Sequence, residues 1–185
     1  MIRSTRWVVA GAILAGLLAA TATAAEDNSK LKVKVGDAFP NVPLVAAQVE
    51  KLPGKKAGDT ISIADLKGKT VVVFFYPRAL TGGCTVESCG FRDLADKFPK
   101  DAVILGASND DTKLQQQFID KNNLPYPLLC DTEFKLINSL GISNGKAAKR
   151  VTFVVGKDGK ILQIYDKVTP KSHPTEVLKF VAEAK

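Results

Sequence analysis

The apolar run Val71–Tyr76 is β-branched and aromatic, and it ends at Pro77. A continuous run of this length, bounded by proline, is typical of a central strand buried on both faces. Ala102–Ala107 predicts a second buried strand. Apolar residues then recur at three- and four-residue spacing after each run, which predicts one helix after each strand. The two helical stripes comprise Phe91, Leu94, Ala95 and Phe98, and Leu114, Phe118 and Ile119, the second capped by Asp110 or Asp111.

The second half of the chain continues with short elements. Asp158-Gly159 is a strong turn signal, so the apolar runs on either side of it predict a β-hairpin. The expected elements are a strand at Pro127–Cys130, a helix over Phe134–Leu140 ended by Gly141, hairpin strands at Val151–Val155 and Ile161–Tyr165, and a helix from about Pro174. This order predicts an α/β fold, with a central mixed sheet flanked by helices in a thioredoxin-like arrangement.

The region before the first buried strand is less regular. Leu31–Val35 alternates apolar residues with lysines, which predicts an edge strand. Residues Gly36–Lys69 are rich in Gly, Pro and Lys, and we expect a loop-rich N-terminal extension containing one hairpin.

The N-terminus has the pattern of a secretory signal peptide. Arg3 and Arg6 precede an apolar run from Trp7 to Ala20, and Thr21–Ala25 then supplies small residues. We expect residues 1–25 to be the signal, cleaved near Ala24 or Ala25, and residues 26–185 to form one domain. The mature protein would be periplasmic or secreted, without stable membrane association. The alternative is an uncleaved anchor, although the run is shorter than the ~20 residues of a membrane span.

Charge adds little to this picture. The formal net charge of +7 includes Arg3 and Arg6, so the mature chain carries 7 − 2 = +5. The lysines are dispersed and no aromatic residues interleave with them, so we expect a solvated basic surface and no nucleic-acid partner.

Candidate chemistry lies in the segment between Pro77 and Asp93, which contains two of the three cysteines, Cys84 and Cys89. This segment joins the carboxyl end of a predicted central strand to a helix, where ligands bind in open α/β sheets. The positive end of the helix dipole stabilises a thiolate there. Thr81 adds a hydroxyl three residues before Cys84. Cys130 ends a predicted buried strand, and we expect it to be a buried free thiol.

The spacing of the two cysteines also carries a mechanical consequence. Residues five apart on a helix have Cα atoms about 8.7 Å apart, whereas a disulfide needs them within about 7 Å. A bond between Cys84 and Cys89 therefore requires the helix start to unwind. Gly90 follows directly and weakens a helix by about 1 kcal/mol relative to alanine.

The motif Pro77-x-x-x-Thr81-x-x-Cys84 resembles the signature of the peroxiredoxins. Glu87-x-Cys89-Gly-Phe-Arg-Asp93 is similar to the bacterioferritin comigratory protein, or peroxiredoxin Q, subfamily. The resemblance implies that peroxide oxidises Cys84 to a sulfenic acid and that Cys89 then forms a disulfide with it. It also implies that Thr81 hydrogen-bonds the thiolate and peroxide, and that Pro77 shields the sulfur.

The resemblance further implies that Arg150 stabilises the thiolate and the transition state. The sequence supports this independently, because Arg150 opens a strand expected to run antiparallel to Val71–Tyr76 and so to end beside Cys84. We expect Glu87 to act electrostatically at the helix N-terminus, Arg92 and Asp93 to form a surface pair, and His173 to be a capping or surface residue.

The chain departs from the family pattern at Gly82, where a proline is usual. That change affects loop rigidity more than chemistry. The resemblance implies peroxide substrates, a thioredoxin-like dithiol reductant, no bound cofactor and a monomeric state. Two alternatives remain: a thioredoxin-like protein disulfide oxidoreductase, which would need C-x-x-C, and a copper-carrying binding protein, which would need more ligands than His173 and Met1 supply.

Overall fold

The computed structural model describes Met1 and residues 30–184. The predicted signal peptide, its cleavage site and the start of the proposed mature domain lie outside the described residues. Within the described part, no helix combines the length and the apolar character needed to cross a membrane.

A seven-stranded mixed sheet forms the centre of the fold, in the order β2-β1-β5-β4-β3-β6-β7. β3 pairs parallel with β4, and β4 pairs parallel with β5. β6 pairs antiparallel with both β3 and β7. The strands are β1 (Leu44–Ala47), β2 (Thr60–Ile61), β3 (Thr70–Phe75), β4 (Ala102–Ser108), β5 (Leu128–Cys130), β6 (Val151–Val155) and β7 (Ile161–Tyr165).

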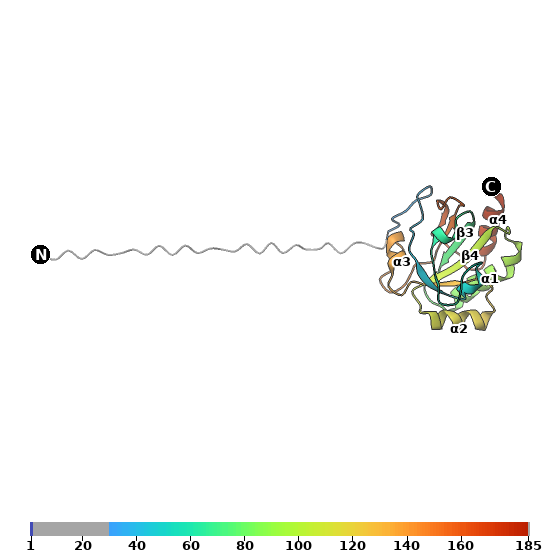
Figure 1. Cartoon of the computed structure of the whole chain (residues 1–185), viewed down its shortest axis with the longest axis horizontal. Helices are drawn as coiled ribbons and strands as arrows, with labels where there is room; N and C mark the ends of the chain where they lie inside the picture. Colours follow the sequence, from blue (N-terminus) through green and yellow to red (C-terminus); the bar gives the residue numbers. More distant parts are fainter. Residues whose placement is uncertain (2–29, 185) are drawn as a thin grey trace.

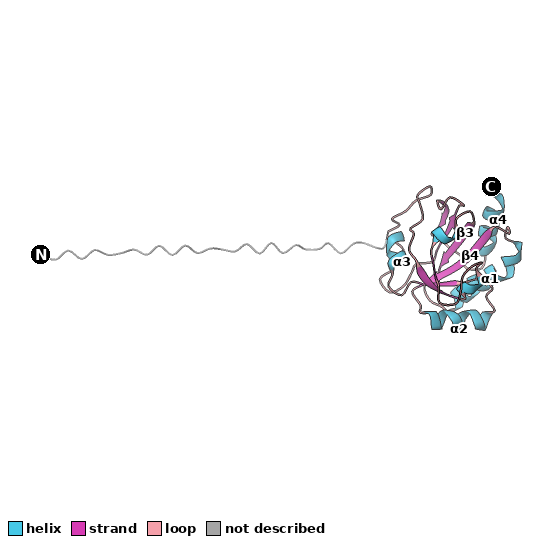
Figure 2. Cartoon of the chain, in the orientation of Figure 1, coloured by secondary structure: helices cyan, strands magenta, loops and turns pink. Residues whose placement is uncertain are grey.

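Helices cover both faces of this sheet (Figures 1 and 2). α1, α2 and α4 contribute to one core, whereas α3 contributes to the other. The helices are α1 (Gly82–Leu94), α2 (Thr112–Asn122), α3 (Lys135–Leu140) and α4 (His173–Glu183), with short 3-10 turns at Val49–Lys51, Ile63–Leu66 and Ala95–Lys97.

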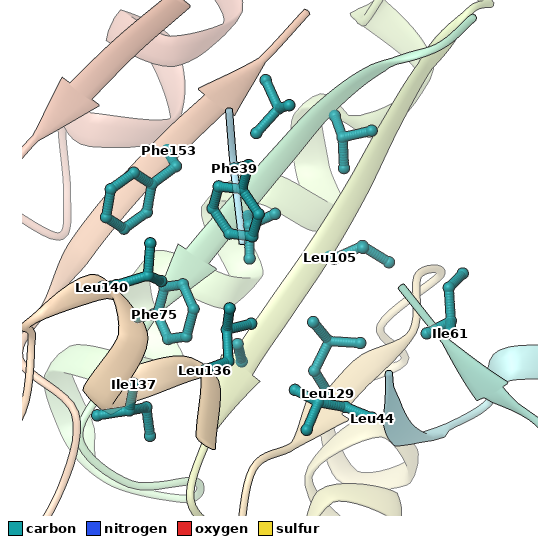
Figure 3. Close-up of a cluster of buried hydrophobic side chains, with 14 of the residues drawn as sticks. Phe39, Leu44, Ile61, Phe75, Leu105, Leu129, Leu136, Ile137, Leu140 and Phe153 are labelled. Atoms are coloured by element: carbon teal, nitrogen blue, oxygen red, sulfur yellow. The ribbon is translucent and has the colours of Figure 1, made fainter. Parts of the chain in front are cut away.

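The central strand β3 supplies side chains to both cores, as its unbroken apolar sequence predicts. Val72, Phe74 and Tyr76 point into the core under α1, α2 and α4. Val71, Val73 and Phe75 point into the core under α3, where Phe75 packs edge-on against Phe153 with ring centroids 6.0 Å apart (Figure 3). The strand is therefore buried on both faces, and its carboxyl end delivers the following loop to a rigid position.

Most of the expected elements are confirmed, with the hairpin strands matching at both ends. Asp111 caps α2 by accepting a hydrogen bond from the Leu114 N–H at 2.8 Å. Gly141 adopts a left-handed conformation (φ 71°) after α3, and its missing Cβ leaves room for the Lys30 carbonyl.

The prediction for Leu31–Val35 is wrong, because this segment forms no strand. Its neighbouring backbone groups bond to separate elements instead: Lys32 N–H to the Leu140 carbonyl, and Gly36 N–H to the Ile161 carbonyl. The extension that follows is also more integrated than its composition predicts. β1 and β2 pair antiparallel as the expected hairpin, and β1 pairs with β5 to lengthen the main sheet.

Candidate active site

The loop between β3 and α1 is held tightly to the end of the sheet. The Tyr76 N–H donates to the Ala107 carbonyl of β4 at 3.0 Å, and the Ala79 N–H donates to the carboxylate of Asp110 at 2.7 Å. Leu80 has φ 62°, a left-handed conformation that turns the chain into the helix. These contacts place Cys84 in the first turn of α1, as the sequence predicts.

Cys84 is 1% exposed, and its sulfur accepts a hydrogen bond from Arg150 Nη2 at 3.1 Å. Arg150 immediately precedes β6, whose Val151 lies opposite Phe75 in the antiparallel register. The predicted meeting of Arg150 and Cys84 is therefore confirmed. The arginine cation and the helix N-terminus both stabilise negative charge on the sulfur.

Glu87 occupies the same site, one turn further along α1. It is fully buried and forms an ion pair with Arg150 Nη1, while its Oε1 has no hydrogen-bond partner among the described residues. Burial raises the pKa of Glu87 to about 7, although Arg150 opposes this shift. The expectation that Glu87 serves the helix N-terminus is wrong: its carboxylate bonds to Arg150. Its i+3 spacing from Cys84 was the sequence signal for a shared helix face.

Thr81 and Pro77 precede Cys84 in the same loop. The structure records no hydrogen bond between the Thr81 hydroxyl and the Cys84 sulfur. Thr81 is exposed, and its hydroxyl donates to the Arg78 carbonyl at 2.9 Å. Pro77 is half-buried. Their expected roles toward peroxide stay predictions. A Cβ at Gly83 would lie 3.4 Å from Arg150 Nη2, which is an ordinary van der Waals contact, so Gly83 lies directly beside the guanidinium.

Cys89 lies on the same helix and is half-buried. Its thiol donates to Oδ1 of Asn122, at the end of α2, with a separation of 3.7 Å. Both Cys84 and Cys89 are free thiols in this structure, which is thus the reduced form with α1 intact. Asn122 was missed from the sequence because it lies 33 positions away and has no local signal.

Arg92 shows both an expected and an unexpected contact. Its Nε bonds Asp93 at 2.8 Å, which confirms the predicted surface pair. Its Nη1 also donates to the Asn122 carbonyl at 2.7 Å, so the arginine joins α1 to α2.

His173 contradicts its prediction as a capping or surface residue. It is fully buried at the start of α4, where Nε2 lies 2.8 Å from the Thr152 hydroxyl and the ring packs edge-on against Phe91. Burial lowers the pKa of His173 to about 4, so the ring is neutral at pH 7. Its neighbour Pro174 fills the space that a side chain at Gly90 would need.

Cys130 is buried, as predicted, at 8% exposure. Burial raises the pKa of its thiol, and β4 separates its strand from β3. Among the described residues, no group of three His, Cys, Asp or Glu side chains could hold a metal ion.

The fold and this thiol site together define a class of protein. Residues 35–164 match the AhpC/TSA family model. The chain therefore belongs to the AhpC/TSA family, as a peroxiredoxin of the Bcp and peroxiredoxin Q type, whose members are thiol-dependent peroxidases that use thioredoxin-type reductants.

Individual relatives agree with this assignment. Peroxiredoxin Bcp of Bacillus subtilis is 39% identical over 131 residues, which cover 66% of this chain and 83% of the relative. Chloroplastic peroxiredoxin Q of Gentiana triflora is 39% identical over 132 residues, covering 69% of this chain and 61% of the relative. The crystal structure of BcpB from Mycobacterium tuberculosis superposes with a TM-score of 0.71 at 31% identity, covering 82% of this chain and 98% of that one.

A further solved structure belongs to a relative that is described by its activity. The bacterioferritin comigratory protein of Xanthomonas campestris, described as having alkyl peroxide reduction activity, has a TM-score of 0.70 at 25% identity, covering 84% of this chain and 99% of that one.

Proposed function

We propose that this peroxiredoxin reduces hydrogen peroxide and organic hydroperoxides through a sulfenic acid on Cys84. The thiolate attacks the terminal oxygen of ROOH, and an S–O bond forms as the O–O bond breaks. The terminal OH stays on the sulfur as the sulfenic acid, and the departing RO⁻ takes one proton from water to leave as ROH. The observation that carries this proposal is the 3.1 Å contact between Arg150 Nη2 and the Cys84 sulfur. The same cation meets charge developing on the peroxide oxygens. The alkyl peroxide activity named for the Xanthomonas campestris protein supports the inclusion of organic substrates.

The second step uses Cys89. Its thiol attacks the sulfenic acid, and Cys84–SOH plus Cys89–SH gives the disulfide plus water. Both sulfurs lie on the single helix α1, so its first turns unwind during this step. A thioredoxin-like dithiol then reduces the disulfide and is itself oxidised.

The location and assembly belong to the same proposal. The N-terminal pattern supports export to the periplasm or beyond, so the donor would be an exported thioredoxin-like protein. The monomeric state of the mature chain is proposed from the family resemblance alone. For the protein recovered from an exporting host, we expect the intact mass of a chain that begins after Ala24 or Ala25. We also expect light scattering to give the mass of a monomer. A retained Met1 would contradict cleavage.

The peroxidase steps are tested with the reduced mature protein and one equivalent of hydrogen peroxide in stopped flow, followed by peptide mapping. We expect oxidation orders of magnitude faster than free cysteine, and a Cys84–Cys89 disulfide with Cys130 free. Cys89→Ser should oxidise equally fast but accumulate a trappable sulfenic acid, whereas Cys84→Ser should not react. A rate equal to that of free cysteine would instead favour protein thiol exchange by the same two sulfurs.

A further inference from the structure

We propose that the hydroxyl groups of Tyr126 and Ser88 set the equilibrium between the folded and the unwound states of α1. This equilibrium, referred to below as the balance, sets the rate at which Cys89 forms a disulfide with oxidised Cys84. This inference rests on the proposed disulfide step. Tyr126 stabilises the folded helix, whereas Ser88 destabilises it and so favours the unwound state. Both are positioning residues, since neither touches the reacting sulfurs through a recorded contact.

Tyr126 ties the resolving turn of α1 to the body of the protein. It lies between α2 and β5, is 5% exposed, and its hydroxyl donates to the Ser88 carbonyl at 2.7 Å. Its ring is fixed edge-on against Phe74 of β3, with centroids 5.8 Å apart. Burial raises the pKa of Tyr126 well above its ordinary value, so the hydroxyl stays a donor. The bonded carbonyl directly precedes Cys89, so this turn cannot leave the helix without breaking the bond.

Asn122 reinforces the same attachment from the end of α2. Its Oδ1 accepts from the Cys89 thiol, and its amide nitrogen donates to the Phe118 carbonyl at 2.9 Å, which fixes the orientation of the side chain. Its backbone carbonyl accepts from Arg92. The carboxyl half of α1 is thus joined to the α2–β5 region at several points. At the start of the helix, by contrast, a Cβ built on Gly82 would meet nothing within 4 Å.

Ser88 works in the opposite direction. Its side chain is fully buried, and Oγ has no hydrogen-bond partner among the described residues. A buried hydroxyl without a partner forgoes the hydrogen bonds that water would give it, which costs free energy in the folded state. Unwinding of this turn returns the hydroxyl to water and removes that cost. Ser88, which directly precedes Cys89, therefore lowers the stability of the helix that must open.

The balance matters because Cys84 sulfenic acid has two fates. It can form the disulfide with Cys89 and release water, or it can react with a second peroxide, giving Cys84–SO2H and ROH. The first fate requires an unwound helix and the second does not. The ease of unwinding therefore decides the ratio of disulfide to sulfinic acid at a given peroxide concentration.

Two conservative substitutions test the proposal because they should act in opposite directions. In the reduced mature protein, Tyr126→Phe should accelerate hydrogen exchange of the α1 amides about fivefold. This is the factor by which the loss of one net hydrogen bond changes an opening equilibrium. It should raise the rate of disulfide formation similarly and lower the yield of sulfinic acid. Ser88→Ala should slow exchange and resolution about tenfold and raise the sulfinic acid yield. The rate of Cys84 oxidation itself should stay unchanged in both variants.

Matched controls separate this balance from general stability. Tyr76→Phe removes another buried hydroxyl from the same core, one that bonds Gln115 at 2.5 Å. Ser139→Ala removes an exposed helical serine from α3. Neither should change α1 exchange relative to the rest of the sheet. The proposal is wrong if Tyr126→Phe and Ser88→Ala leave α1 exchange unchanged or shift it in the same direction.

The disulfide step and the balance between folded and unwound α1 can be refuted independently. Hydrogen exchange of the reduced protein needs no peroxide, so it measures the balance even if no disulfide forms. Absence of a Cys84–Cys89 disulfide in wild type would refute the proposed resolution step and its control by this balance. Opposite exchange shifts with an unchanged disulfide-to-sulfinic ratio would refute only the link between unwinding and resolution.

Discussion

Glu87 and Cys84 both bond the guanidinium of Arg150, which uses Nη1 for the carboxylate and Nη2 for the sulfur. The two acceptors lie three residues apart on α1, while the arginine comes from the start of β6. Two potential negative charges therefore share one half-buried cation, so the ionisation of Glu87 alters the charge balance at the sulfur. This arrangement gives the site a pH dependence of its own.

Arg150→Lys should lower the second-order rate constant for Cys84 oxidation about 100-fold, because lysine keeps a charge but loses the fork that reaches both partners. Stopped-flow oxidation with hydrogen peroxide measures this. Arg78→Lys, at an exposed position in the preceding loop, is the matched control and should have little effect. A loss below threefold for Arg150→Lys would contradict the role assigned to the fork.

Glu87→Gln should change the pH profile of Cys84 oxidation. As pH rises through about 7, Glu87 gains a charge that competes for Arg150 and repels the thiolate. The wild-type rate constant should therefore rise less steeply from pH 6 to 8 than that of Glu87→Gln. Superimposable profiles would show that the carboxyl does not titrate in this range.

His173 should make the protein less stable in mild acid. Its pKa in the folded state, about 4, lies below its unfolded value of about 6.5, so its contribution is present above pH 6.5 and is lost as pH falls toward 4. Glu87 acts in the opposite sense, because its folded pKa of about 7 is raised: its contribution is present below about 4.5 and lost as pH rises through 7.

Urea unfolding of wild type, His173→Asn and Glu87→Gln between pH 4 and 8 separates these terms. His173→Asn should have a smaller fall in unfolding free energy from pH 6.5 to 4 than wild type. Glu87→Gln should have a smaller fall from pH 4.5 to 7. Equal slopes in all three proteins would contradict both assignments.

Gly90→Ala should fail to stabilise the protein, unlike a usual helical Gly→Ala change, which gains about 1 kcal/mol. A Cβ at Gly90 would lie 2.8 Å from Cγ of Pro174, so α4 must shift to admit it. Gly82→Ala, with nothing within 4 Å, is the control and should not destabilise. Thermal unfolding of both variants measures the difference.

Cys130→Ser should leave turnover intact. Cys130 lies on β5, with β4 between it and the strand that leads to Cys84, and its thiol is buried. The Cys84–Cys89 disulfide should form at the wild-type rate in stopped flow and peptide mapping. A large loss of rate would reveal a role for this thiol in the reaction.

Local patterns in the sequence determined the elements and the chemistry. The continuous apolar run of β3 predicted burial on both faces, because a strand with two packed faces has no polar side to alternate with. The spacing of Cys84 and Cys89, combined with helix geometry, predicted that the helix must unwind before the two sulfurs can bond. Arg150 was also found, since the antiparallel pairing of β6 with β3 places its start at the carboxyl end of β3.

The tertiary structure decided which distant groups complete the site. Nothing local in the sequence shows that α4 packs on α1, so only the fold buries His173 and makes Gly90 a close-packing position. Tyr126 and Asn122 likewise reach α1 from more than 30 positions away. The periodicity of apolar residues indicates whether a side chain faces the core. Which residue that side chain contacts depends on how separate elements pack, and this packing exists only in the folded chain.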